Sequence, residues 1–143
     1  MRKYFFLLIF CWANNLIAAS AKDYSFNKIT TNDPIKKIVK EIAKSNVYEY
    51  PALGNAVRTA SEQNSRFVEL LKITNNDDLI KLATKYKNAV VRLYAYRAIV
   101  QKFKEVPKDI LDQFNNDTSV VNTLRGNIAD KTTVKEIAGS FLY

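Results

Sequence analysis

Paired carboxylate side chains are the residues of this chain whose types and spacing could do chemistry. Glycoside hydrolysis needs only two carboxylic acids, and either Glu62 with Glu69 or Asp77 with Asp78 could supply them. Each pair also has a simpler explanation. The two glutamates are expected on the exposed side of one helix, and the two aspartates suit the first turn of another, where the helix dipole favours negative charge. The pairs therefore do not predict an enzyme.

The residue types that most enzymes and metal sites require are scarce in this chain. It contains no histidine, and its one cysteine, Cys11, lies in the apolar N-terminal segment. Serine and cysteine nucleophile systems therefore lack their base or their nucleophile, and the common zinc sites lack their ligands. The three glycines are widely separated, so they do not form a glycine-rich phosphate loop. We expect no cofactor, no bound metal and no enzymatic activity.

The N-terminus has the order of a secretory signal peptide. A basic pair at residues 2–3 precedes an apolar run over residues 4–13, and small residues at positions 19–21 suit a cleavage site. A retained membrane anchor is the alternative, but a span needs about 20 apolar residues and Asn14 interrupts this run. The sequence therefore predicts that residues 1–21 are removed and that the protein is periplasmic or secreted in a bacterium.

The chain is basic, with 22 lysines and arginines against 14 aspartates and glutamates and a net charge of +8. This charge suits an acidic protein partner, an anionic polymer or membrane surface, or nucleic acid. The lysines occur singly or in pairs, which is typical of a solvated surface. Nucleic acid is the weakest candidate, because Arg58, Arg66 and Arg97 have only Tyr96 as a neighbouring aromatic residue, and we expect Tyr96 to be packed.

Helical periodicity extends over most of residues 33–143, after a polar tail at residues 22–32. Residues 52–60 suit a short helix, and the segment Thr133-x-x-Glu136 is a capping box for the last helix. The β-prone residues are confined to Val120–Leu124. The sequence therefore predicts a single all-α domain of about six helices, packed as short antiparallel pairs.

Residues 75–102 have the pattern of two helices joined by a short turn, which is a helical hairpin. The second helix is apolar nearly all round, so we expect it to be buried at the centre of the domain. Its segment "NAVVRLYAYRAI" resembles the second helix of a HEAT-like repeat, with Val91 and Arg92 followed by the small residues Ala95 and Ala98. The chain also resembles small exported bacterial HEAT-repeat proteins. The resemblance implies an α-α superhelix, no established activity, and a structural role for Arg92 in hydrogen bonds between neighbouring turns.

These observations favour an exported, non-catalytic module that binds another protein. Stacked helix pairs present extended curved surfaces that commonly bind partners, and a basic surface attracts an acidic partner. We expect the contact residues to be exposed on the inner helices, at Arg66, Arg97 and Gln101. An immunity or inhibitor protein that neutralises a toxin is a narrower form of this hypothesis. The alternative is a cell-envelope scaffold that binds an anionic polymer or membrane through its basic face. We expect a monomer.

Overall fold

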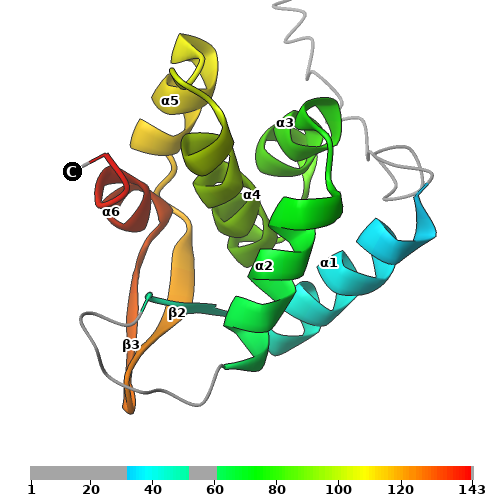
Figure 1. Ribbon diagram of the computed structural model, residues 1–143. Helices are drawn as coiled ribbons and strands as arrows, with labels where there is room; N and C mark the ends of the chain where they lie inside the picture. The colour runs from blue at the N-terminus through cyan, green and yellow to red at the C-terminus, as the bar shows by residue number, and fades with distance from the viewer. Residues whose placement is uncertain (1–31, 52–60, 143) are drawn as a thin grey trace, which may run out of the picture.

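The computed structural model of the chain describes residues 32–51 and 61–142. The predicted signal peptide at residues 1–21 and the predicted helix at residues 52–60 lie outside the described residues. None of the described helices is long and apolar enough to cross a membrane. The described residues form six helices and three strands (Figure 1), in the order α1 (Asp33–Ser45), β1 (Val47–Glu49), α2 (Glu62–Ile73), α3 (Asn76–Lys85), α4 (Ala89–Lys102), α5 (Lys108–Asn115), β2 (Val120–Arg125), β3 (Ile128–Thr133) and α6 (Val134–Gly139).

The prediction of an all-α fold is wrong, because the chain contains a three-stranded mixed sheet. Strands make up 15% of the described residues and helices 62%. The strand order is β1-β2-β3, in which β1 runs parallel to β2 and β2 runs antiparallel to β3. The sheet brings the segment after α1 beside the C-terminal hairpin (Figure 1). A continuous stack of helix pairs is therefore also excluded as the architecture of the described chain.

The hairpin of β2 and β3 follows from the residues at its turn. Arg125 pairs with Ile128, so Gly126 and Asn127 form a two-residue turn. Gly126 has a φ of 70°, a left-handed conformation that costs glycine nothing but strains other residues. Two-residue turns with glycine at the first position match the twist of the flanking strands. The β-prone segment predicted at Val120–Leu124 is confirmed as β2, but its partner strand was not predicted.

Helix α4 is the centre of the molecule. Nine of its residues are buried, and α1, α2, α3, α6, β1 and β2 all contact it. The prediction that this helix is buried between neighbours is confirmed. Ala95 and Ala98 are fully buried, and α3 packs along α4 as the expected hairpin (Figure 1). The likeness of this hairpin to a HEAT-like repeat remains a prediction.

The two faces of the sheet differ because strand side chains alternate between them. The face toward the helices, the inner face, carries the buried side chains of Tyr48, Val121 and Thr123. The alternate residues lie on the opposite side of the sheet. We call this side the outer face; it comprises Val47, Glu49, Val120, Asn122, Leu124, Ala129, Lys131 and Thr133.

The edge of the sheet at β1 is closed by side chains from two helices. Gln63 Nε2 of α2 donates to the Val47 carbonyl at 2.8 Å. The Glu49 N–H donates to the Tyr94 hydroxyl of α4 at 3.0 Å. Both side chains are buried, so backbone groups at this edge are paired without a further strand. Covering an edge in this way prevents another chain from pairing with it.

Candidate functional site

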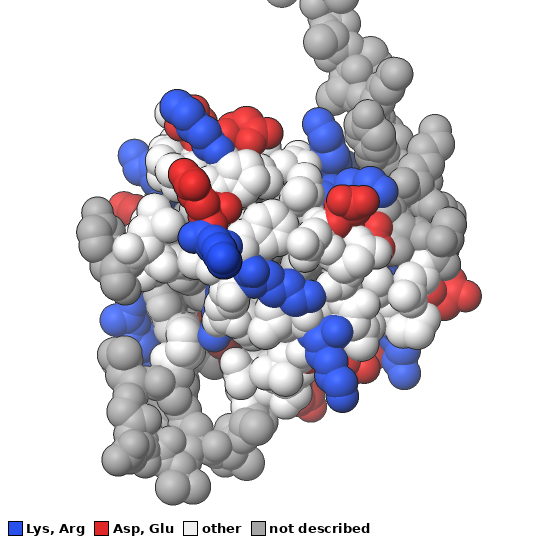
Figure 2. Space-filling view, turned by 45° about the horizontal axis from the view of Figure 1, so that its top comes forward, with Lys and Arg blue, Asp and Glu red and all other residues white. Residues whose placement is uncertain are grey.

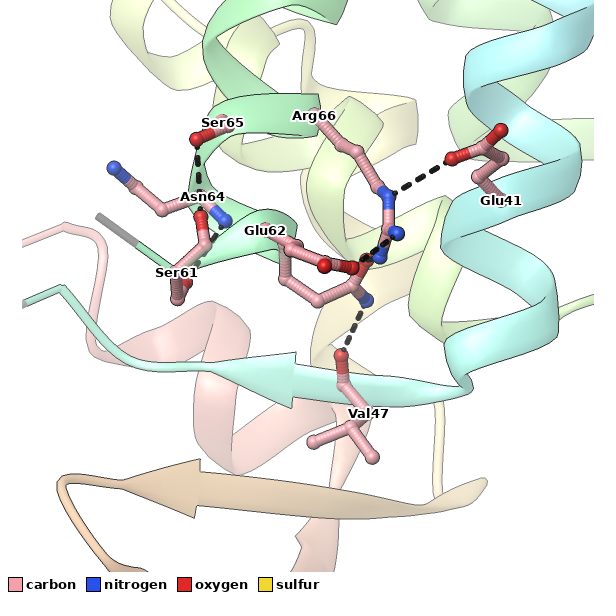
Figure 3. Close-up of polar contacts among 8 residues, drawn as sticks. Glu41, Val47, Ser61, Glu62, Asn64, Ser65 and Arg66 are labelled. Atoms are coloured by element: carbon pink, nitrogen blue, oxygen red, sulfur yellow. Dashed lines mark hydrogen bonds and ion pairs between the residues drawn. The ribbon is translucent and has the colours of Figure 1, made fainter. Parts of the chain in front are cut away.

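Arg66, a predicted binding residue, holds α2 against α1. A serine cap starts α2, since Ser61 Oγ accepts from the Asn64 N–H at 3.1 Å. One turn later Arg66 donates to Glu41 of α1 at 3.3 Å and to Glu62 at 2.7 Å, as Figure 3 shows. Its side chain is 21% exposed. Because two carboxylates already hold this guanidinium, a ligand anion would have to displace them.

The surface around Arg66 carries side chains of both charges, so it does not favour a ligand of either charge. A hollow of about 560 Å³ between α1 and α2 is lined by both acidic and basic side chains, namely Asp33, Lys37, Glu41, Arg66 and Glu69, beside Pro34 and Ile38. Glu62 lies outside this lining and borders an adjacent hollow with Lys44 and Ser45. The candidate carboxylate pair Glu62 and Glu69 therefore does not share one cavity.

Arg97 is buried, contrary to the expectation that it is exposed on an inner helix. Only 9% of the residue is exposed, and the guanidinium carbon lies 4.1 Å from the centre of the Phe67 ring. Burial raises the pKa of the neighbouring Tyr48 hydroxyl, and the nearby Arg97 charge partly opposes that rise. Gln101 is exposed. Arg66, Arg97 and Gln101 thus do not form one exposed surface.

Arg92 connects three segments of the fold. Its Nη1 donates to the carbonyls of Tyr86 at 3.2 Å and Lys87 at 2.9 Å, in the turn between α3 and α4. Its Nη2 forms an ion pair with Asp117 at 2.7 Å. Burial alone would raise the pKa of the Asp117 carboxyl, but hydrogen bonds from Ser119 and Arg92 outweigh it and hold that pKa below its ordinary value. The group is therefore charged at neutral pH.

The outer face of the sheet is the candidate site that the structure adds. It carries a hollow of about 560 Å³ that is lined mainly by apolar atoms of all three strands. The lining consists of the outer-face residues Val47, Asn122, Leu124, Ala129 and Lys131, together with Thr123 and Asp130, which lie between them along β2 and β3. At the start of β2 the Val120 residue is 65% exposed. Asn122, Ala129 and Lys131 of this face are also exposed. The alternation of β2 and the turn at Gly126 were the sequence signals that could have located it.

Charge does not mark a second site on the face shown in Figure 2. Figure 2 shows basic side chains at many places on the face that it presents, with acidic side chains beside several of them. In the described part of the chain no three metal-ligating side chains lie together. No protein-family model matches the chain, and no curated protein sequence matches it significantly.

Proposed function

We propose that this chain is an exported, non-catalytic module that binds a protein partner through the outer face of its sheet. The observation that carries the proposal is the apolar hollow on that face. Antiparallel sheets often leave one face in water, but such faces normally carry polar side chains. Here Val47, Val120, Leu124 and Ala129 stand on it, and apolar surface of this kind stabilises a complex when it is removed from water.

A protein partner fits this face better than an anionic polymer or membrane does. The charged residues of the outer face are Lys131 and Glu49, one of each sign. A polyanion site would instead gather lysines and arginines along one surface. An immunity or inhibitor protein for an incoming toxin is the form of the proposal that suits an exported chain whose residues 22–143 contain neither histidine nor cysteine.

Two exposed valines provide a matched test. Val120 on the outer face is 65% exposed and Val68 on α2 is 53% exposed. A partner recovered by residues 22–143 from the producing cells should be lost with Val120→Asp and retained with Val68→Asp, in a high-salt wash. Circular dichroism checks that both variants are folded. Equal recovery by the two variants would contradict the proposal, and recovery only at low salt would favour the polyanion alternative.

A further inference from the structure

The second edge of the sheet, at β3, differs from the closed edge at β1. A two-residue hairpin turn closes on a hydrogen-bonded pair, here Arg125 and Ile128. Bonded and non-bonded pairs then alternate along the ladder. The N–H and C=O groups of Ala129, Lys131 and Thr133 therefore point away from β2. Two bonds agree with this: the Lys131 N–H donates to Asp130 Oδ1 at 2.7 Å, and the Thr133 N–H to Glu136 Oε2 at 3.0 Å.

This edge is exposed to solvent. Residues 128–131 are all exposed, and Ile128 is the most exposed large apolar residue of the described chain, at 71%. In the described structure β2 is the one strand that pairs with β3. A sheet edge that no neighbouring strand pairs is a template for another extended segment.

We infer that β3 receives an extended segment of the partner protein as a fourth strand. This inference rests on the proposed function and names the chemistry of the partner. Opposite Lys131, on the outer face, the segment presents an acidic side chain, since opposite charges stabilise cross-strand pairs. On the other side of the sheet, which carries Ile128 and Asp130, it presents apolar side chains toward Ile128. The partner segment therefore alternates acidic and apolar residues.

A second copy of this chain fits the edge less well. In an antiparallel self-pair that uses the outward groups of Ala129 and Lys131, one register places Lys131 opposite its own copy. The neighbouring register, in which Ala129 faces Lys131, places Asp130 opposite its own copy. Like charges directly opposite each other destabilise a strand pair. In both of these registers charge favours a different chain with complementary residues over a homodimer.

Asp130 regulates access to the edge. Its carboxylate occupies the Lys131 N–H, which an incoming strand needs as a donor. Strand addition must displace this bond, so the side chain acts as a local competitor. Natural edge strands use charged side chains in this way to suppress unwanted pairing. Removing the carboxylate should therefore strengthen binding of the correct segment.

Three variants separate the contribution of the β3 backbone to peptide binding from the contribution of its side chains. Lys131→Pro removes the outward N–H, and proline is tolerated at an edge position whose N–H takes no part in the strand ladder. Lys131→Ala removes the charge and keeps the N–H, and Asp130→Ala removes the competitor. The probe is a fluorescent peptide of alternating glutamate and valine, about as long as β3. Its control is the lysine–valine peptide, and fluorescence anisotropy measures both affinities on the full chain.

We expect the glutamate peptide to bind more tightly than the lysine peptide. Lys131→Pro should weaken it by at least about tenfold, and Asp130→Ala should tighten it by roughly fivefold, the affinity equivalent of about one net hydrogen bond. Lys131→Ala should lose the preference for glutamate. Equal affinity of Lys131→Pro and the parent chain would overturn the inference. So would a dimer of the parent chain that Lys131→Pro dissociates.

The two proposals fail in different ways. If Val120→Asp abolishes capture of the partner but Lys131→Pro leaves it unchanged, the outer face binds the partner and the edge does not. In that case the strand-addition inference falls and the proposed function stands. If neither variant reduces capture, both fall.

Discussion

The hydroxyl of Tyr94 offers the clearest energetic test of how the sheet is joined to the helices. Tyr94 is fully buried, and its ring centre lies 5.0 Å from that of Tyr48 and 5.8 Å from that of Phe67. The hydroxyl accepts the Glu49 N–H at 3.0 Å, and burial raises its pKa to about 12. Tyr94→Phe keeps the ring contacts and leaves this backbone N–H without its acceptor.

The expected loss of stability follows from the hydrogen bond and its surroundings. A net hydrogen bond contributes about 0.5–1.5 kcal/mol, and an unpaired buried donor costs about 1–3 kcal/mol. Because Glu49 is half-buried, we expect Tyr94→Phe to lower the free energy of unfolding by about 1–2 kcal/mol. In urea this corresponds to a midpoint roughly 0.5–1 M lower.

Tyr96 supplies the matched control in the same helix. It is also fully buried, and its ring stacks on Phe114 with centres 4.1 Å apart. Its hydroxyl is buried and finds no hydrogen-bond partner among the described residues. Tyr96→Phe should therefore leave the free energy of unfolding unchanged or raise it. Equal losses for the two variants would refute the view that helix side chains pair the backbone at this edge of the sheet.

Three further perturbations test local parts of the fold by urea unfolding. Hydrogen bonds from Thr132 and Thr133 lower the pKa of Glu136 from 4.5 to about 2. The ionised carboxylate therefore stabilises the fold at neutral pH, and this stabilisation is lost as pH falls through about 2. The difference in the free energy of unfolding between the parent chain and Glu136→Gln should disappear over the same range, and a constant difference would contradict this. Arg92→Ala should cost about 2–4 kcal/mol, because its partner Asp117 is left largely buried; a loss below that of Asp117→Asn would be inconsistent. Gly126→Ala should cost about 1–2 kcal/mol, because of its left-handed φ, and no loss would argue against the turn.

The sequence predicts best those elements that local residues determine. The capping box at Thr133 and Glu136 is present, and the helical period of α1 buries Ile35, Ile38 and Ile42. These features depend on neighbours within one or two turns of chain. A period repeated over several turns is difficult to satisfy in any other conformation.

Strands β1 and β3 could not be recognised in this way. β1 has three residues, too few for a visible alternation, and its pairing with β2 joins residues 75 positions apart, Val47 and Asn122. β3 is exposed on both sides over residues 128–131, so its sequence carries no buried face. Only the turn at Gly126, read together with the valines of β2, pointed to a second strand.

The burial of Arg97 and the ion pairs of Arg66 were not predicted because the surroundings of both residues are non-local. Arg97 is buried beneath Phe67 of another helix, and Arg66 is held by Glu41, which lies 25 residues earlier. Neither partner can be inferred from spacing along one helix. Because the sheet itself was not predicted, its outer face could not be proposed as a binding site.

The most direct test of the docking surface is site-specific photocrosslinking in the cells that produce the protein. A photoreactive residue at Asn122 lies in the middle of the outer face, and one at Gln113 lies exposed on α5. The outer-face proposal predicts a one-to-one crosslink from position 122 to one protein, absent from position 113 and abolished by Val120→Asp. Crosslinking that is absent from position 122, or equal from both positions, would contradict it.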